Sequence, residues 1–297
     1  MSGGLSVLIP VFNWPVGELV ASLLAQRAAW PGPIEILLFD DGSDERFRIL
    51  NRPLQGQSNV LYHELPRNVG RAAIRNQLAA AAQHEWLLLL DNDNLLPDAH
   101  FLARYAAACT QVDVLIGGTC YAPTPPADPA LRLRWLYGQA REARPSTVRQ
   151  ITPYGQLTIN NALIRTEIFR CFPLDERLTG YGHEDTRLGE ALAAAQVSIR
   201  HLDNPVRHEG LEPAAVFLQK SEQAVRNLAQ SYRENLPGSP SRLLQAALRL
   251  RRLRLAAPAR LALGAAAPGL RRQLLSAAPR LVLFDLLKLH WLLRELG

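Results

Sequence analysis

Cysteine and lysine are scarce in this chain. The three cysteines, Cys109, Cys120 and Cys171, are odd in number, far apart and without a Cys-x-x-Cys pair. That usage argues against a disulfide framework and a zinc site, and it fits a reducing compartment, so we expect a cytoplasmic protein. Lys220 and Lys288 are the only lysines, which leaves arginine to carry nearly all of the positive charge.

Several catalytic motifs are also missing. The chain has no Gly-x-Gly-x-x-Gly after a strand, no Gly-x-x-x-x-Gly-Lys-Ser/Thr and no Gly-x-Ser-x-Gly. Dinucleotide, P-loop and hydrolase sites therefore lose support. Four His-Glu dipeptides begin at His63, His84, His183 and His208, but none continues to the second histidine of a His-Glu-x-x-His protease.

The C-terminal end has few acidic residues and no long uncharged run. Residues 238–297 hold eleven basic residues against Asp285 and Glu295, a net charge of +9, which leaves −3 for residues 1–237 of a chain whose total is +6. No stretch there reaches the roughly 18 apolar residues that a membrane-spanning helix needs. We therefore expect residues 237–297 to form a basic tail of two or three short amphipathic helices that does not cross a membrane.

What is present is an alternation of apolar strands and amphipathic helices. Strand-like segments occupy residues 5–13, 34–39, 59–64 and 85–90, with helical patterns at 16–26 and 70–82. This order predicts an α/β fold with a mostly parallel sheet flanked by helices. Further helices are expected over residues 98–108, 131–144 and 184–195, and extended segments over 112–118, 158–165 and 197–201, with residues 206–208 just beyond the last of these.

Two acidic clusters follow two of these strands. Asp91 and Asp93 come directly after the apolar run 86–90, and Asp40 and Asp41 follow the run 34–39. Residues at i and i+2 of an extended segment point to one side, so Asp91 and Asp93 can converge on a cation such as Mg²⁺ or Mn²⁺. The alternative for Asp91 and Asp93 is a turn that ends the strand. For Asp40 and Asp41 one reading is contact of one aspartate with a bound nucleobase or ribose, and the alternative is a turn in which an aspartate or serine caps the next helix.

A third acidic pair, Glu184-Asp185, stands at an expected helix start, after Gly180-Tyr181-Gly182. One reading is favourable interaction with the helix dipole. The other is a general base under a loop that closes on a ligand, because glycines make such a loop flexible. His208 is either a packed histidine or a nitrogen ligand that joins Asp93 on a cation.

Arginines precede the fourth strand on one helix face. Arg71 and Arg75 are four residues apart, so both can reach the same group. They can meet a diphosphate, pair with the aspartates or remain solvated.

The ordered set of motifs runs from residue 6 to residue 185. It consists of Ser6-Val7-Leu8-Ile9-Pro10-Val11-Phe12-Asn13, Asp40-Asp41-Gly42-Ser43, Asn68-Val69-Gly70-Arg71 to Asn76, Asp91-Asn92-Asp93 and Gly182-His183-Glu184-Asp185. In this order the motifs resemble those of the family 2 glycosyltransferases of GT-A fold, over about residues 5–210. The tail lies outside the resemblance.

The resemblance implies an inverting transferase that uses a nucleotide-diphosphate sugar, commonly a UDP-sugar, with Mn²⁺ or Mg²⁺. Asp185 is then the catalytic base beside Glu184, while Asp93 of the Asp-x-Asp motif and His208 hold the metal. The nucleotide-sugar site is expected to comprise Pro10, Val11, Asn13, Asp40, Asp41, Gly70, Arg71, Arg75, Asp91 and Asn92. Acceptor and loop residues are expected to be Asn161, Tyr181, Gly182 and His183.

We therefore predict a glycosyltransferase domain over residues 1–236, with a nucleotide-binding half up to about residue 110 and an acceptor-binding half over 111–236. Its acceptor is expected to be a saccharide or lipid-linked hydroxyl in cell-envelope or polysaccharide biosynthesis. The tail has two readings, contact with an anionic membrane on the inner face of the plasma membrane, or packing and homodimer contact. Rival functions are a sugar-nucleotide pyrophosphorylase and a non-catalytic sugar-binding relative. Nucleic-acid binding is not expected, because the main domain is negative.

Overall fold

A seven-stranded sheet forms the centre of the N-terminal part of the chain in a computed structural model, which describes residues 3–110, 112–176, 184–233 and 241–297. The strand order is β3-β2-β1-β4-β8-β6-β9. The strands are β1 (Leu5–Val11), β2 (Ile34–Asp40), β3 (Val60–Glu64), β4 (Trp86–Leu90), β6 (Val114–Ile116), β8 (Asn161–Arg165) and β9 (Ile199–His201). Only β8 runs antiparallel to its neighbours, so the prediction of a mostly parallel sheet is confirmed.

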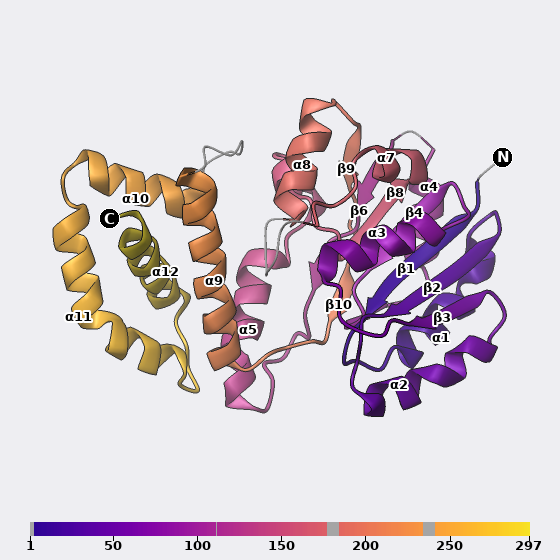
Figure 1. The fold of residues 1–297 in the computed structure, drawn as a ribbon, viewed down its shortest axis with the longest axis horizontal. Coiled ribbons are helices and arrows are strands. Elements are labelled where there is room, and N and C mark those ends of the chain that lie inside the picture. Colours follow the sequence, from indigo (N-terminus) through magenta and orange to yellow (C-terminus); the bar gives the residue numbers. More distant parts are fainter. Residues whose placement is uncertain (1–2, 111, 177–183, 234–240) are drawn as a thin grey trace. The chain divides into compact units, whose positions relative to one another are not determined.

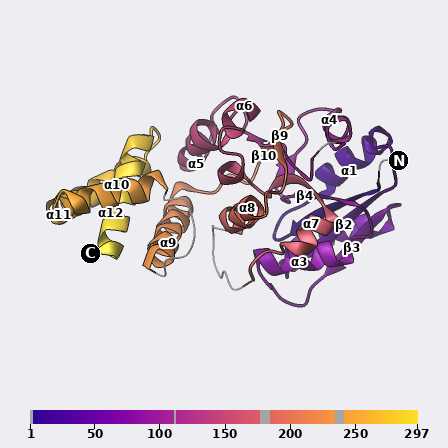
Figure 2. The same ribbon diagram turned by 90° about the horizontal axis from the view of Figure 1, so that it is seen from above.

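Helices cover both faces of this sheet, as Figure 2 shows. On one face lie α1 (Gly17–Ala25) and α4 (Phe101–Ala108), and on the other lie α3 (Arg71–Ala81), α7 (Thr166–Cys171) and α8 (Glu184–Ala194). Alternate residues of one strand serve the two cores, because successive side chains point to opposite faces. Val7 packs on the α1 side and Leu8 on the α3 side.

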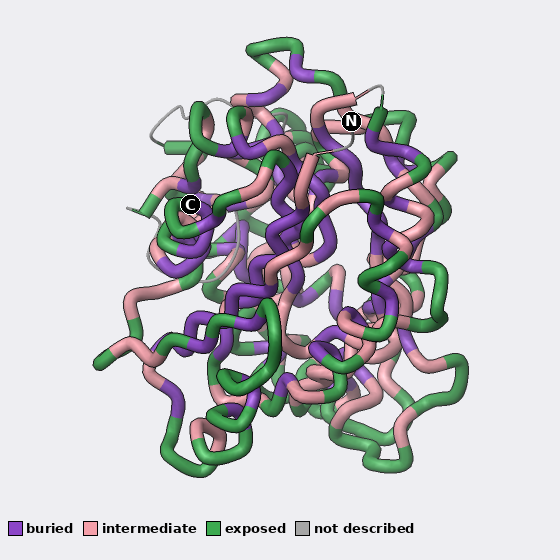
Figure 3. Tube along the Cα trace, turned by 90° about the vertical axis from the view of Figure 1, so that its right-hand side faces the viewer, coloured by how far each residue is buried: buried purple, intermediate pink, exposed green. Residues whose placement is uncertain are grey.

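The buried strands explain the apolar runs of the sequence. All five residues of β4 are buried, and the tube in Figure 3 is largely purple along the central strands. Burying a leucine side chain contributes about 1.5–3 kcal/mol, so the four leucines of β4 fix this strand in the interior. The polar residues that follow β4 are thereby held at the edge of the sheet.

A small second sheet links distant parts of the chain. It has the order β5-β10-β7, with β5 (Asn94–Leu95), β7 (Thr119–Cys120) and β10 (Val206–His208). β10 is antiparallel to β5 and pairs His208 with Asn94. This pairing brings residue 208 beside residue 93.

Four of the described helices were not expected from the sequence. They are α2 (Glu45–Asn51), α6 (Ser146–Arg149), α7 and α9 (Ala214–Arg233). α2 and α6 are too short to show an apolar period. The helix expected over residues 131–144 is α5 (Arg132–Tyr137), which continues as one π-helical stretch, Gly138–Glu142.

The chain divides into two compact units, and residues 122–141 and 211–297 belong to the second. Besides α5 and α9 it contains α10 (Arg242–Arg252), α11 (Ala256–Leu274) and α12 (Leu281–Leu296), labelled in Figure 1. Phe217, Phe284 and Trp291 lie in its buried core. The expected boundary at residue 236 lies outside the described residues, so the predicted division stays a prediction. Within the described ranges, no helix has the length and apolar character to span a bilayer.

One glycine provides a test of the turn after β2. Gly42 has φ +78°, and a Cβ there would lie 2.6 Å from the backbone nitrogen of Asn68. We expect Gly42→Ala to lower the free energy of unfolding by about 1–3 kcal/mol, measured by urea denaturation. Gly56→Ala is the matched control, because no atom lies within 4 Å of its added Cβ. Equal effects of the two substitutions would contradict this account of the turn.

Candidate active site

The carboxylate of Asp91, at the end of β4, is bound by two arginines of α3. Arg75, whose side chain is 4% exposed, pairs with Asp91 Oδ1, and Arg71 Nη2 lies 3.9 Å from Oδ2. Burial alone would raise the pKa of Asp91, but Arg75 and then Arg71 outweigh it and hold that pKa below its ordinary value. Of the readings open for these arginines, the structure shows pairing with an aspartate.

Arg71 also connects this strand end to the start of α8. Its Nε lies 3.7 Å from Oε1 of Glu184, a buried residue. The end of β4, the start of α3 and the start of α8 therefore meet at one place. Residues separated by more than a hundred positions along the chain contribute to this single charged cluster, which we call the Asp91 cluster (Arg71, Arg75, Asp91, Glu184 and Asp185).

Asp185 has the most informative protonation behaviour in the cluster. Burial and the adjacent Glu184 carboxylate raise the pKa of Asp185 to about 6, although Arg71 and Arg75 act in the opposite direction. The N–H of Ile159 lies 3.4 Å from its Oδ1. A carboxylate with a pKa near 6 is ionised at neutral pH and is a stronger base than an ordinary aspartate.

Asp93 and His208 lie together because β5 pairs with β10. His208 Nδ1 is 3.4 Å from Asp93 Oδ1, and the N–H of Glu209 donates to the Asp93 carbonyl at 2.8 Å. Asp93 Oδ1 is buried and has no hydrogen-bond donor. Gly210 allows this approach, since a Cβ there would lie 2.0 Å from Asp93 Oδ2.

The carboxylate of Asp93 and the imidazole of His208 are suitable ligands for a hard divalent cation. A buried carboxylate oxygen without a donor costs free energy unless a cation or a solvent molecule meets it. Oxygen with one imidazole nitrogen suits Mn²⁺, and phosphate oxygens can complete such a set. Among the described residues, no group of three or more His, Cys, Asp or Glu side chains is arranged for a metal, so Asp93 and His208 would supply only part of the coordination.

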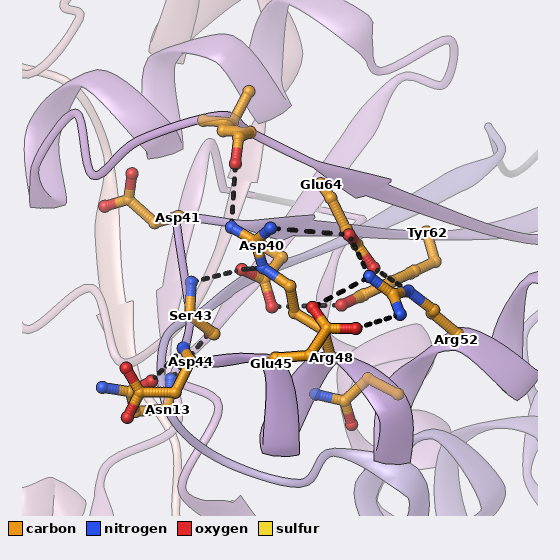
Figure 4. A network of polar contacts seen from close by, with 12 residues as sticks. Asn13, Asp40, Asp41, Ser43, Asp44, Glu45, Arg48, Arg52, Tyr62 and Glu64 are labelled. Carbon is orange, nitrogen blue, oxygen red and sulfur yellow. Dashed lines mark hydrogen bonds and ion pairs between the residues drawn. The ribbon is translucent and has the colours of Figure 1, made fainter.

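Asp40 has a different environment from its neighbour Asp41. Its Oδ1 accepts from the N–H of Ser43 at 2.7 Å, and its Oδ2 accepts from the hydroxyl of Tyr62 at 3.0 Å. Arg48 Nε lies 3.7 Å from Oδ1. Figure 4 shows this network reaching outward to Glu64 and Arg52. Asp40 therefore fixes the turn after β2 through contacts within the protein.

Asp41 holds the loop before α3. Its two oxygens accept from the N–H groups of Val69, at 2.6 Å, and Gly70, at 3.2 Å. Burial raises the pKa of Asp41, against the lowering effect of these two hydrogen bonds. In Figure 4 the Asp41 carboxylate is turned away from that of Asp40. Gly70, with φ +95°, begins α3 where a side chain would be strained.

The residues after β1 form the other side of this turn. Asn13 accepts from the N–H of Asp44 at 2.8 Å, and its own N–H donates to the hydroxyl of Ser43. Asn92 donates to the carbonyl of Phe12 at 3.1 Å, which ties the segment after β4 to the segment after β1. Pro10 and Val11 are the last two residues of β1, and they pair with Phe39 and Asp40 of β2. The predicted nucleoside residues thus share one edge of the sheet.

Asn161 is buried within the protein. Its Oδ1 accepts from Tyr105, and its Nδ2 donates to the carbonyls of Gly118 and Asn204, both at 2.8 Å. It therefore holds loops together, and its predicted contact with an acceptor stays a prediction. The predicted loop residues Tyr181, Gly182 and His183 lie outside the described residues.

Three residues beside the Asp93 pair were not predicted. Tyr121 packs its ring on the His208 ring at 5.5 Å between centroids, and the side-chain oxygens of Asn94 and Asn160 are buried without a donor. Nothing in the sequence marks Tyr121 or Asn160, because their roles depend on the pairing of β10 with β5 and β7.

Comparison with known proteins gives a family match over the N-terminal part of the chain. A model of the family described as Glycosyl transferase family 2 matches residues 6–171. The hyaluronan synthase of Pasteurella multocida is 29% identical over 131 residues, which are 42% of this chain and 13% of that protein. An uncharacterized glycosyltransferase of Haemophilus influenzae is 32% identical over 95 residues, 31% of this chain and 37% of its own length. The chain therefore covers well under two thirds of these curated relatives.

Solved structures share the fold. A mannosyltransferase from Pyrobaculum calidifontis, in complex with GDP-Man and Mn²⁺, gives a TM-score of 0.53 at 15% identity over 80% of this chain and 66% of that chain. TarS of S. aureus in complex with UDP gives 0.50 at 18% identity over 75% and 65% of the two chains. At these identities the similarity establishes the fold alone.

Proposed function

Because this chain belongs to glycosyl transferase family 2 and has its GT-A fold, we propose that it moves a sugar from a nucleotide-diphosphate sugar to an acceptor hydroxyl with inversion. The observation that carries the proposal is the Asp91 cluster, in which Arg71 joins Asp91 to Glu184 beside a base with a pKa of about 6. The donor is a UDP-sugar of the hexose or N-acetylhexosamine class. The acceptor is a saccharide or lipid-linked hydroxyl used in cell-envelope or polysaccharide biosynthesis.

Asp185 acts as the general base. A sugar hydroxyl is a weak nucleophile at neutral pH, so the Asp185 carboxylate takes its proton as the oxygen attacks the anomeric carbon. The bond from that carbon to the diphosphate breaks in the same step, and the nucleotide diphosphate leaves with the electron pair. Attack from the opposite face inverts the anomeric centre, and no covalent intermediate with the protein is needed.

Asp93 and His208 would hold Mn²⁺ or Mg²⁺. When bound, the cation supplies Lewis-acid stabilisation of the charge on the departing diphosphate. Asp93 is suited to this role because its buried Oδ1 has no donor, and His208 lies 3.4 Å from that oxygen. By analogy, the Mn²⁺ and GDP-Man in the mannosyltransferase structure support a cation at the donor site, and the UDP in the TarS structure supports a nucleotide donor.

The nucleoside half of the donor is proposed to lie on the edge formed by Pro10, Val11, Asn13 and Asn92. Asp41 and Gly70 shape this edge through the hydrogen bonds that fix the loop before α3. Asp40 supports it from within, since both of its oxygens already accept hydrogen bonds. Arg75 holds Asp91 in place, because its guanidinium group is paired with the Asp91 carboxylate.

The proposal is tested by donor turnover. The protein is incubated with UDP-glucose, UDP-N-acetylglucosamine or GDP-mannose, with Mn²⁺, Mg²⁺ or excess chelator, and released nucleoside diphosphate is measured. We expect turnover of at least one UDP-sugar with a cation, a loss of about 100-fold or more with chelator, and recovery when Mn²⁺ is restored. Full turnover in excess chelator would refute the metal role.

Two further assays discriminate the rival functions. A sugar-nucleotide pyrophosphorylase would instead release pyrophosphate from a nucleoside triphosphate and a sugar 1-phosphate. A non-catalytic relative would bind a nucleotide sugar, detected by calorimetry, without releasing nucleoside diphosphate under any metal condition. Either result would replace the proposed transferase activity.

A further inference from the structure

A pocket of about 320 Å³ lies where α10, α11 and α12 of the second unit come together. Three arginines line it, Arg251, Arg254 and Arg260. The remaining lining residues are small or apolar apart from the backbone, and they are Ala256, Ala257, Leu293, Leu296 and Gly297. In Figure 1 the end of α12 lies beside α10. We call this site the arginine pocket.

The three arginines differ from Arg226 and Arg294 of the same unit in having no ion pair with a side-chain carboxylate of a described residue. Arg226 and Arg294 both pair with Glu222, at 3.1 and 2.7 Å. No ion pair with a side-chain carboxylate among the described residues involves Arg251, Arg254 or Arg260. Three cations that converge on one pocket repel one another, so an anion there would relieve the repulsion.

The start of α11 adds to the positive field. Ala256 and Ala257 are the first residues of this helix, and no side chain caps their N–H groups. The N-terminal end of a helix carries a partial positive charge that favours phosphate groups. Arg254, with φ +58°, forms the tight turn that places α10 and the start of α11 on the same pocket.

Large exposed apolar side chains lie next to the arginines in the sequence. Leu253 is 58% exposed, Leu255 is 49% exposed and Leu261 is 72% exposed. These three leucines come from the turn between α10 and α11 and from the first turns of α11. Exposed leucines alternating with arginines are typical of a surface that lies in the interface of an anionic membrane.

We propose that the arginine pocket binds the phosphate of an anionic phospholipid headgroup while Leu253, Leu255 and Leu261 enter the adjoining acyl boundary. Charge complementarity favours this occupant, because residues 238–297 carry a net charge of +9. A second copy of the chain would bring the same positive surface against itself. A soluble phosphate would use the arginines but would leave the leucines in water. The proposal does not rest on the transferase activity.

Vesicle co-sedimentation of the full chain tests the proposal, with vesicles of phosphatidylcholine alone or mixed with phosphatidylglycerol. The pocket variant combines Arg251→Gln, Arg254→Gln and Arg260→Gln. The matched control, which removes the same charge away from the pocket, combines Arg242→Gln, Arg271→Gln and Arg272→Gln. The control residues lie at the start of α10 and in the last turn of α11, a helix of 19 residues that spans about 28 Å.

We expect the wild type to bind the mixed vesicles at least about tenfold more tightly than phosphatidylcholine vesicles. The pocket variant should lose most of this preference, and the control variant should keep most of it. If both variants lose this preference equally, the arginine pocket is not a specific lipid site, and the vesicles attract the basic surface only through its total charge. Absence of vesicle binding by the wild type would also overturn the proposal.

A second pair of variants separates a lipid from a soluble anion and from a second copy. Leu253→Ser with Leu261→Ser should weaken binding to mixed vesicles at least about fivefold, while Leu275→Ser, at an exposed leucine in another part of the unit, should not. If inorganic phosphate binds the pocket and the leucine variant binds vesicles normally, the ligand is a soluble phosphate and the proposal fails. If the wild type forms dimers at high concentration and the pocket variant does not, the occupant of the pocket is a second copy of the chain and the lipid proposal fails. Donor turnover and circular dichroism of each variant show that the catalytic unit and the fold are intact.

Discussion

Replacing Asp185 with asparagine is expected to lower sugar transfer by about 10²–10⁴-fold at neutral pH, the usual contribution of a general base. Asparagine keeps the shape of the side chain and can still accept from the N–H of Ile159, but it cannot take a proton. The loss should appear in kcat with little change in KM for the donor. The measurement is steady-state release of nucleoside diphosphate in the presence of acceptor.

The same residue predicts the pH dependence of the wild type. A base must be ionised to act, and burial together with Glu184 raises the pKa of Asp185 to about 6. Transfer should therefore be nearly constant above about pH 7 and fall about tenfold for each pH unit below the pKa. The free energy of unfolding depends on pH in the opposite direction from that of an ion-paired aspartate. Because the pKa of Asp185 is raised from 3.8 to about 6 in the folded state, this group destabilises the fold as the pH rises through that range. The destabilisation is absent when the pH is below the unfolded-state pKa.

Glu190→Gln is the matched control for Asp185→Asn, because Glu190 lies in the same helix, α8, and outside the Asp91 cluster. It should change transfer by less than about threefold, as expected for a group that does not take part in proton transfer. If Asp185→Asn retains full transfer, or if the wild-type rate is flat between pH 5 and 7, Asp185 is not the base.

The sequence was sufficient to predict the central sheet because burial leaves a direct mark on composition. A parallel strand covered on both faces is apolar throughout, and β4 and residues 36–39 of β2 show this pattern. The acidic residues after these strands could then be assigned to one sheet edge. Short helices such as α2 leave no such mark, since one or two turns are too few for a 3.6-residue period to show.

The partners of the acidic residues could not be derived from local sequence. Asp40 and Asp41 are adjacent and identical, yet Asp40 binds Ser43 and Tyr62 whereas Asp41 binds the loop before α3. A one-residue step along an extended segment reverses the direction of a side chain, so each aspartate faces different elements. Which elements lie there depends on how the chain returns from far away.

The same limit applies to the pair Asp93 and His208. Their approach depends on β5, a strand of two residues, pairing with β10 more than a hundred positions later. A two-residue strand has no pattern that distinguishes it from a turn. The family resemblance suggested that His208 is a metal ligand, and the geometry now gives that suggestion a distance that can be tested.

Replacing Asp93 with asparagine is expected to lower transfer by about 100-fold or more. The cation that Asp93 is proposed to hold stabilises the developing charge on the diphosphate and lowers the activation free energy by several kcal/mol. Folding should be nearly unaffected without metal, since Asp93 Oδ1 has no hydrogen-bond donor to lose. The decisive measurement is therefore metal binding. Mn²⁺ at about 100 times its Kd should stabilise the wild type by about 2.7 kcal/mol, seen as a higher Tm.

Asp93→Asn should lose most of that Mn²⁺-dependent rise in Tm together with the activity, because both depend on the same carboxylate. Asp98→Asn is the control, since Asp98 is an exposed aspartate five positions away that pairs with Arg104. It should keep the rise in Tm and the activity within about threefold, as is usual for a surface ion pair. A His208→Gln variant should weaken Mn²⁺ binding less than Asp93→Asn, because a neutral imidazole contributes no charge. A Tm rise with Mn²⁺ that persists in Asp93→Asn would place the cation elsewhere and remove Asp93 from the mechanism.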